Sequence, residues 1–250
     1  GCLAQRSPAE LGRVPGVDVV LGMGELERLP GVLAECLRSR PRAPGQGPAD
    51  TRAPARERGP SRVWVGRPEV PLGLPRLLST GATAYLKIAE GCDRHCTFCI
   101  IPRLRGRYRS RPVEELVGES RCLVEQGARE LVLVAEDTSR YGWDIYGEAA
   151  LPRLLRELAS VDGVEWIRVL YAYPHRFPLD VARLMAEEER VLAYLDLPLQ
   201  HVSDRVLARM GRPYRGEDVR RLLDCLRALV PGIVLRSTFL VGFPGETEED

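Results

Sequence analysis

Three of the seven cysteines of this 250-residue chain lie close together in GCDRHCTFC (91–99). Cys92 and Cys96 are separated by three residues, and Cys96 and Cys99 by two. Cysteine thiolates are the usual ligands of a [4Fe–4S] cube. Three ligands leave one iron open, and an open position is typical of a catalytic metal site rather than a closed structural one. The spacing therefore predicts a cluster whose free iron could chelate the amino and carboxylate groups of a small molecule.

Two other kinds of site could use this motif. A zinc site would need a fourth ligand, for which His95 and Cys122 are candidates, but the paired cysteine or histidine units typical of zinc sites are absent from the sequence. An electron-transfer ferredoxin needs a fourth cysteine nearby, and none follows Cys99 before Cys122. Cys36, Cys122 and Cys225 are interpreted as buried, inert thiols. Iron–sulfur chemistry is the favoured interpretation.

The elements that must position this motif alternate along the chain. Apolar, β-branched runs predict strands and amphipathic runs predict helices. Such an alternation indicates a parallel sheet with right-handed crossovers, here a partial (β/α) barrel of the α/β class. Active sites of these barrels lie at the carboxyl ends of the strands, and the cysteine motif follows the first one. Strands are expected at 83–90, 130–136, 165–173, 192–200 and 233–243, and helices at 112–127, 151–161, 179–189, 203–210 and 216–230.

The region before the barrel has a different character. Residues 17–23 predict a short buried strand, and residues 25–37 a helix with a kink at Pro30. Eight prolines between 41 and 75 indicate a flexible linker. The expected domains are the end of a small α/β domain at 1–39, a Pro/Arg-rich linker at 40–75, and a barrel at 76–250 that stops before its last strand. The chain is interpreted as a fragment lacking both ends.

Composition excludes some classes of protein. Lys and Arg number 36 and Asp and Glu 35, a net charge of +1, so the chain as a whole is neither a basic nucleic-acid coat nor an acidic tail. No apolar run is long enough to span a membrane, and no secretory signal opens the sequence. Clustered cysteines without an export signal favour a reducing compartment, so a cytoplasmic location is expected.

The segment YLKIAEGCDRHCTFCIIPRLRGRYRSRP (85–112) is similar to the methylthiotransferase family of radical S-adenosylmethionine (SAM) enzymes. These proteins share a GC-x-x-x-C-T-F-C-x-x-P loop followed by RG and SRP. The resemblance implies an enzyme in which a reduced cluster donates an electron to SAM, cleaving it to methionine and a deoxyadenosyl radical. The radical takes hydrogen from an unactivated carbon, which then receives sulfur. No catalytic residue is assigned beyond the cluster.

The same resemblance implies a second [4Fe–4S] cluster, held by three cysteines of an N-terminal domain, which delivers the methylthio group. GCLAQR (1–6) resembles the third cysteine motif of that domain. Cys2 would then be one ligand of the auxiliary cluster, with its partners upstream. One thiolate cannot hold a cube, so only one of the two clusters is expected to be fully ligated by this chain.

The string AEDTSRYG (135–142) resembles the branch that modifies the β carbon of an aspartate in a small-subunit ribosomal protein (RimO-type). A tRNA adenosine methylthiotransferase of the 2-methylthio-N-isopentenyladenosine type is the alternative. The implied partners are the ribosomal protein, a reducing electron donor and a sulfur donor.

Five alternating arginines beside the cysteine loop could attract an acidic substrate segment or ribosomal RNA. The alternative is a solvated basic face. These residues are Arg103, Arg105, Arg107, Arg109 and Arg111.

Polar residues at the strand ends are the expected contacts for SAM. Glu136, Asp137 and Gln200 follow apolar strands, at the predicted mouth of the barrel, where charged groups interact strongly. Gly242 would permit close approach of the backbone to a ligand, and Glu246 could accept a hydrogen bond. The alternative is structural: Asp137 could cap the element that follows it, and 242–246 could be a plain strand-to-helix turn.

Overall fold

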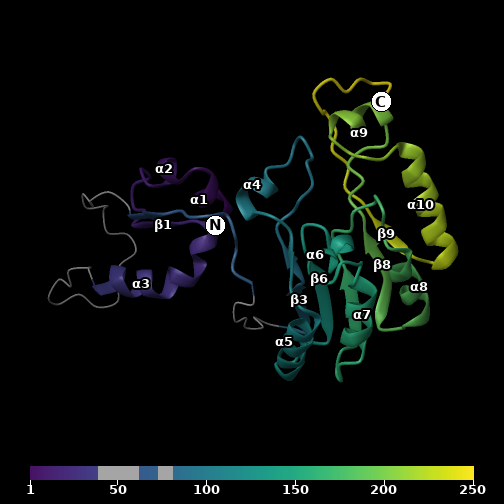
Figure 1. The fold of residues 1–250 in the computed structure, drawn as a ribbon, viewed down its shortest axis with the longest axis horizontal. Helices are drawn as coiled ribbons and strands as arrows, with labels where there is room; N and C mark the ends of the chain where they lie inside the picture. The colour runs from purple at the N-terminus through teal and green to yellow at the C-terminus, as the bar shows by residue number, and fades with distance from the viewer. Residues whose placement is uncertain (39–61, 73–80) are drawn as a thin grey trace. The chain divides into compact units, whose positions relative to one another are not determined.

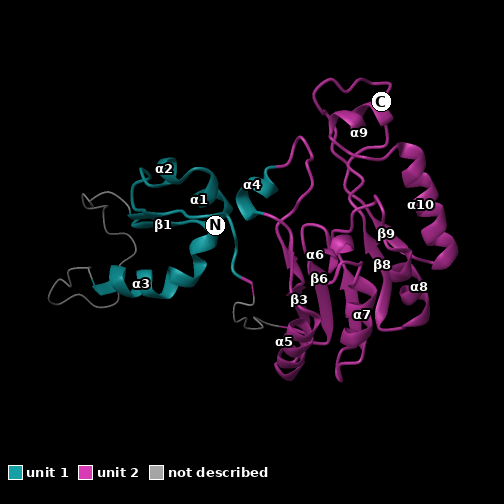
Figure 2. Ribbon diagram, in the orientation of Figure 1, with its two compact units in different colours: residues 1–71, 100–106 teal, residues 72–99, 107–250 magenta. Residues whose placement is uncertain are grey.

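A computed structural model describes residues 1–38, 62–72 and 81–250 of the chain. They divide into two compact units, coloured separately in Figure 2. Unit 1 comprises residues 1–71 and 100–106, and unit 2 comprises residues 72–99 and 107–250. Residues 100–106, which the sequence places in the barrel domain, thus belong to the N-terminal unit.

Unit 2 is built on a five-stranded sheet in the order β3-β6-β7-β8-β9, and every neighbouring pair is parallel (Figure 1). The predicted α/β class with a parallel sheet is confirmed. The strands are β3 (Thr83–Lys87), β6 (Glu130–Val134), β7 (Trp166–Val169), β8 (Val191–Asp196) and β9 (Val234–Arg236). Since all five run the same way, their carboxyl ends share one edge of the sheet.

The main helices of unit 2 lie between these strands along the chain. Their apolar faces pack on the sheet, where Leu133 of β6 and Leu154 of the second helix are fully buried. The first helix begins after Pro112 with Glu114 and Glu115 in its first turn, where the helix dipole favours acidic groups. The helices are α5 (Val113–Glu125), α7 (Leu151–Ala159), α8 (Leu179–Glu187), α9 (Asp204–Arg209) and α10 (Gly216–Leu229).

The predicted strand 83–90 is two strands. After β3 the chain bends into β4 (Ala89–Glu90), which pairs antiparallel with β5 (Arg109–Ser110). The sequence did not predict β5, because two residues carry no periodic pattern. It also missed three short helical elements: α4 (Ile101–Arg105), η2 (Thr138–Arg140) and α6 (Trp143–Tyr146). The β4–β5 pair joins the two ends of the segment that contains the three cysteines.

Unit 1 contains a second, smaller parallel pairing, between β1 (Val19–Leu21) and β2 (Arg62–Trp64). The linker prediction is wrong for residues 62–64, because Val63 and its neighbours supply backbone hydrogen bonds to β1. Residues 65–72 form no helix or strand, and the rest of the predicted linker, 40–61 and 73–75, lies outside the described residues. The predicted kinked helix 25–37 is a 3₁₀ helix followed by an α-helix. The helices are α1 (Cys2–Arg6), α2 (Pro8–Leu11), η1 (Met23–Arg28) and α3 (Leu29–Arg38).

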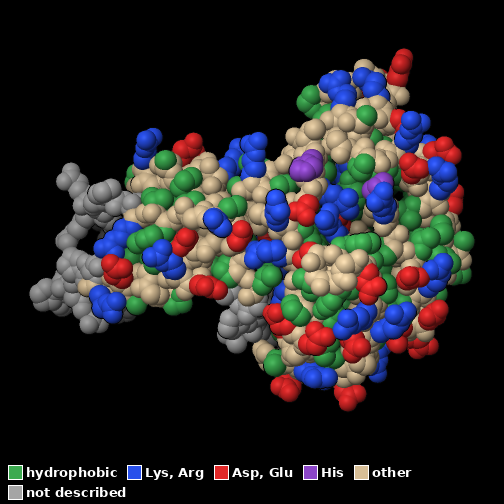
Figure 3. All heavy atoms as spheres, in the orientation of Figure 1, with side chains coloured by type: hydrophobic (Ala, Val, Ile, Leu, Met, Phe, Trp, Pro, Cys, Tyr) green, Lys and Arg blue, Asp and Glu red, His purple; other side chains and the backbone are tan. Residues whose placement is uncertain are grey.

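The surface is charged but mixed in sign. On the face drawn in Figure 3, acidic and basic side chains are interspersed rather than gathered into a field of one sign. Among the described residues, no helix has the length and apolar character that crossing a membrane requires.

Candidate functional site

The cysteine loop, residues 91–99, leaves β4 at the carboxyl edge of the sheet. Gly91 has a left-handed backbone (φ 80°), which lets the chain turn sharply there. Cys92 is buried, Cys96 is half-buried and Cys99 is exposed. The pKa of Cys92 is raised to about 11, chiefly by burial; the hydrogen bond from the Arg94 backbone lowers it, and the nearby charges of Asp137, Cys96 and Cys99 raise it. The three sulfurs therefore share one electrostatic environment.

One side of the loop is held by an ion pair between Arg94 and Asp137. The Nε and Nη2 atoms of Arg94 donate to Oδ2 of Asp137 at 3.0 and 2.9 Å. The Asp137 side chain is only 1% exposed, and its Oδ1 accepts from Ser139 Oγ at 2.5 Å. Tyr108 also donates its hydroxyl to the Asp137 carbonyl at 2.9 Å. Since Arg94 stands between Cys92 and Cys96, this pair anchors the loop to the end of β6.

The other side of the loop rests on the turn after α9. The Thr97 amide donates to the Met210 carbonyl at 3.1 Å, and its hydroxyl donates to the Arg209 carbonyl at 2.9 Å. Gly211 follows with a left-handed backbone (φ 71°), and a Cβ built there would lie 2.8 Å from the His95 carbonyl oxygen. This turn can approach the loop closely because position 211 has no side chain.

We expect Gly211→Ala to weaken the cysteine loop. A left-handed alanine costs on the order of 1 kcal/mol, and the clash with the His95 carbonyl adds to that cost. The measurement is urea unfolding together with iron content after anaerobic reconstitution. Gly232→Ala is the matched control, because Gly232 has a similar φ of 82° but nothing near its Cβ position. Equal losses in both variants would show that the close approach at 211 is unimportant.

A cluster of aromatic rings around Arg212 completes this side of the site. The guanidinium lies 4.7 Å from the ring centroid of Tyr173, 5.7 Å from that of Phe98 and 5.9 Å from that of Tyr214. Tyr173 carries Arg94 on its ring as well, at 4.0 Å. The sequence did not single out Arg212 or Tyr173 as site residues; the available signal was that Tyr173 ends the predicted strand 165–173 and that Arg212 follows the predicted helix 203–210.

The predicted SAM contacts at the ends of β6 and β8 have different surroundings. Both carboxylate oxygens of Asp137 are engaged, by Arg94 and Ser139, so the structure gives this side chain a positioning role. Glu136 beside it is half-buried. Gln200 has a left-handed backbone (φ 70°) although it is not glycine. Strained backbone of this kind concentrates at functional sites. Contact of these side chains with SAM stays a prediction.

The segment after β9 also reaches the loop. Phe243 packs edge-on against Phe98, with ring centroids 6.5 Å apart. The adjacent Gly242 has a φ of 74°, and the space at its Cβ position is open. Glycine is therefore favoured there by the left-handed backbone and not by a close neighbouring atom. Glu246 accepts from the Phe243 amide at 2.7 Å, and its other oxygen lies 3.5 Å from His201 Nε2. Glu246 thus closes its own turn in the structure.

Cys2, the candidate auxiliary-cluster ligand, lies in unit 1 at the start of α1. It is half-buried, and its thiol contacts the Met23 sulfur at 3.9 Å. Its role as a cluster ligand stays a prediction.

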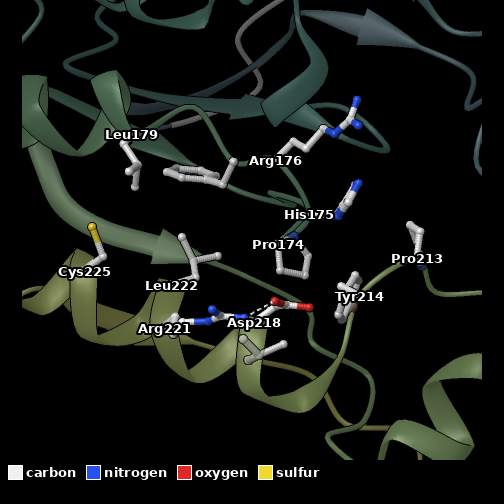
Figure 4. Close-up of a pocket in the computed structure, with 12 residues that line it drawn as sticks. Pro174, His175, Arg176, Leu179, Pro213, Tyr214, Asp218, Arg221, Leu222 and Cys225 are labelled. Atoms are coloured by element: carbon white, nitrogen blue, oxygen red, sulfur yellow. Dashed lines mark hydrogen bonds and ion pairs between the residues drawn. The ribbon is translucent and has the colours of Figure 1, made fainter.

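A separate pocket of about 430 Å³ opens between α10 and the loop that leads from β7 to α8 (Figure 4). His175 and Arg176 border it on one side, with Asp218 and Arg221 of α10 on the other. Burial lowers the pKa of His175, and the Arg176 charge lowers it further. The His175 ring stacks on Tyr214, so this pocket adjoins the aromatic cluster around Arg212.

The donor set at the loop fits an iron–sulfur cube. Its three thiols share one environment, and the charges of Arg212 and Arg94 counter the burial that raises the Cys96 pKa, as an anionic thiolate cluster requires. Within residues 1–38, 62–72 and 81–250, no three His, Cys, Asp or Glu side chains gather tightly enough to hold one metal ion. Ligands of one ion crowd around a point, whereas the thiolates of a cube bind separate irons and stand further apart.

Fold and site together define a class. Residues 86–250 match the Radical SAM superfamily, and the chain belongs to that superfamily. An iron–sulfur cluster and SAM are the cofactors that this family implies. Over its whole length the chain is 49% identical to the ribosomal protein uS12 methylthiotransferase RimO of Desulforudis audaxviator, and 47% identical to that of Moorella thermoacetica. It covers 52% and 54% of these proteins, so it spans about half the length of such relatives.

One solved structure is similar to this chain in fold. The radical SAM methyltransferase TsrM from Kitasatospora setae, with cobalamin and a [4Fe–4S] cluster bound, has a TM-score of 0.55 and 24% identity. The match covers 67% of this chain and 32% of that one. At this identity the likeness concerns the fold alone.

Proposed function

We propose that this chain carries the radical SAM part of an enzyme that adds a methylthio group to the β carbon of an aspartate in ribosomal protein uS12. The observation that carries the proposal is the full-length similarity to uS12 methylthiotransferases, at 49% identity for one of them. The cysteine loop at the carboxyl edge of the parallel sheet supports it, because that edge is where such folds bind their substrates.

In this proposal Cys92, Cys96 and Cys99 hold three corners of a [4Fe–4S] cluster. When bound, the cluster supplies the electron that cleaves SAM. Arg94, fixed by Asp137, and Thr97, fixed by the turn after α9, hold the loop rigid around the cluster. Glu136, Gln200 and the 242–246 turn are proposed to line the space for SAM at the same edge. Cys2 is proposed as one ligand of a second cluster that delivers the methylthio group.

The test is incubation of the whole enzyme that contains this chain with uS12, SAM, a one-electron reductant and a sulfide source, followed by peptide mass spectrometry. The expected result is one methylthio group in place of a hydrogen on a single aspartate. Substitution of that aspartate by Asn in uS12 should remove the product. The same gain in mass on a tRNA adenosine, with none on uS12, would overturn the proposal in favour of a tRNA-modifying enzyme.

A further inference from the structure

A buried cation beside the cysteine loop has no acidic partner. Arg212 is 9% exposed, its Nε has no hydrogen-bond partner, and in the described part of the chain no carboxylate forms an ion pair with it. A charge taken out of water is costly unless an opposite charge or a favourable dipole compensates it. The rings of Phe98, Tyr173 and Tyr214 supply such compensation in part, through their electron-rich faces.

The charge of Arg212 reaches the cysteine loop. Its guanidinium lies 5.7 Å from the ring of Phe98, which stands between Cys96 and Cys99, and the turn before it holds the Thr97 amide through the Met210 carbonyl. Arg94 also belongs to this loop, but its charge is already matched by Asp137. Of the two guanidinium groups that sandwich Tyr173, Arg212 is therefore the one whose charge remains to be balanced by an anion at the loop.

We propose that Arg212 raises the reduction potential of the cluster held by Cys92, Cys96 and Cys99. The inference rests on the proposed function, because it needs that cluster. In the step concerned, one electron passes from an external one-electron reductant to the cluster; no bond or proton changes place. The net negative charge of the thiolate-bound cluster grows by one. A fixed cation in a poorly solvated position favours the more negative form.

The aromatic rings around Arg212 hold its side chain in this buried position. Guanidinium is planar and weakly hydrated, so it stacks on aromatic rings where an ammonium group would seek water. Tyr214 is itself fixed by a hydrogen bond from its hydroxyl to the Leu199 carbonyl at 3.2 Å. Tyr173 is held between the two guanidinium groups at 4.0 and 4.7 Å. Arg212 acts through the field it exerts, as a positioning residue rather than a catalytic one.

The test is a redox titration of the reconstituted protein without SAM, followed by the electron paramagnetic resonance signal of the reduced cluster. In Arg212→Gln the ratio of reduced to oxidised cluster at a fixed potential should fall about tenfold, a negative shift of about 59 mV for one electron. Arg212→Lys keeps the charge and should stay near the wild type. Arg220→Gln removes one charge from the exposed face of α10 and should change nothing.

Arg212→Met covers the case in which Arg212→Gln does not fold, because its apolar chain leaves no polar group unpaired; it must show the same negative shift. Loaded clusters with equal midpoints in the wild type and in the neutral variants would overturn this inference and leave the proposed function standing. A wild-type protein that binds no cluster would overturn the proposed function, and this inference with it.

Discussion

Replacing Cys92, Cys96 or Cys99 with alanine is expected to abolish cluster binding. Each thiolate of a three-ligand cube holds a different iron, so no neighbouring group replaces a lost one. Cys92 is buried, and Cys96 and Cys99 lie near enough for their charges to raise its pKa. Iron analysis after anaerobic reconstitution should fall from about four irons per chain to near zero, with loss of the visible iron–sulfur absorption.

Cys122→Ser is the matched control for these variants. Cys122 is exposed on α5, away from the loop, and its substitution should leave the iron content unchanged. Full iron content in any one of the three loop variants would contradict the ligand assignment. Zinc in place of iron in the wild type, without colour, would instead favour the zinc interpretation of the motif.

Arg94→Met is expected to lower the free energy of unfolding of unit 2 by about 3–5 kcal/mol. The substitution leaves the carboxylate of Asp137, which is 1% exposed, without its cation in a site that water does not reach. Asp137→Asn should cost less, because Arg94 is 24% exposed and can turn its guanidinium toward solvent. Urea unfolding of the single and double variants measures the difference.

The double variant separates the ion pair from its surroundings. If the two charges stabilise each other, Arg94→Met with Asp137→Asn costs less than the sum of the single variants. Arg153→Met is the control: its exposed pair with Glu114, 3.1 Å long against 2.9 Å for Arg94 and Asp137, should be worth under about 1 kcal/mol. A similar loss for Arg153→Met and Arg94→Met would contradict the argument from burial.

The strands and helices of unit 2 lie where local patterns in the sequence predict them. Runs such as ELVLV (130–134) have a β-branched, apolar pattern that only a buried strand satisfies, and β6 spans those residues. The predicted ends of these elements were less accurate than their type. The predicted strand at 233–243 is regular only over Val234–Arg236, because the polar residues beyond Arg236 bond to the chain after β8 instead of continuing the ladder.

Some features of the candidate site also follow from the local sequence, and others depend on the tertiary structure. The sequence by itself determined the class of chemistry, because the spacing of three thiols and their place after the first strand are local properties. It also placed Asp137 at a strand end. Only the tertiary structure decided that Asp137 binds Arg94 and that Arg212 lies beside the loop. Thr97 and Arg209, which meet there, are 112 positions apart. Contacts over such a separation depend on the order in which strands pair, and no local pattern of residues records that order.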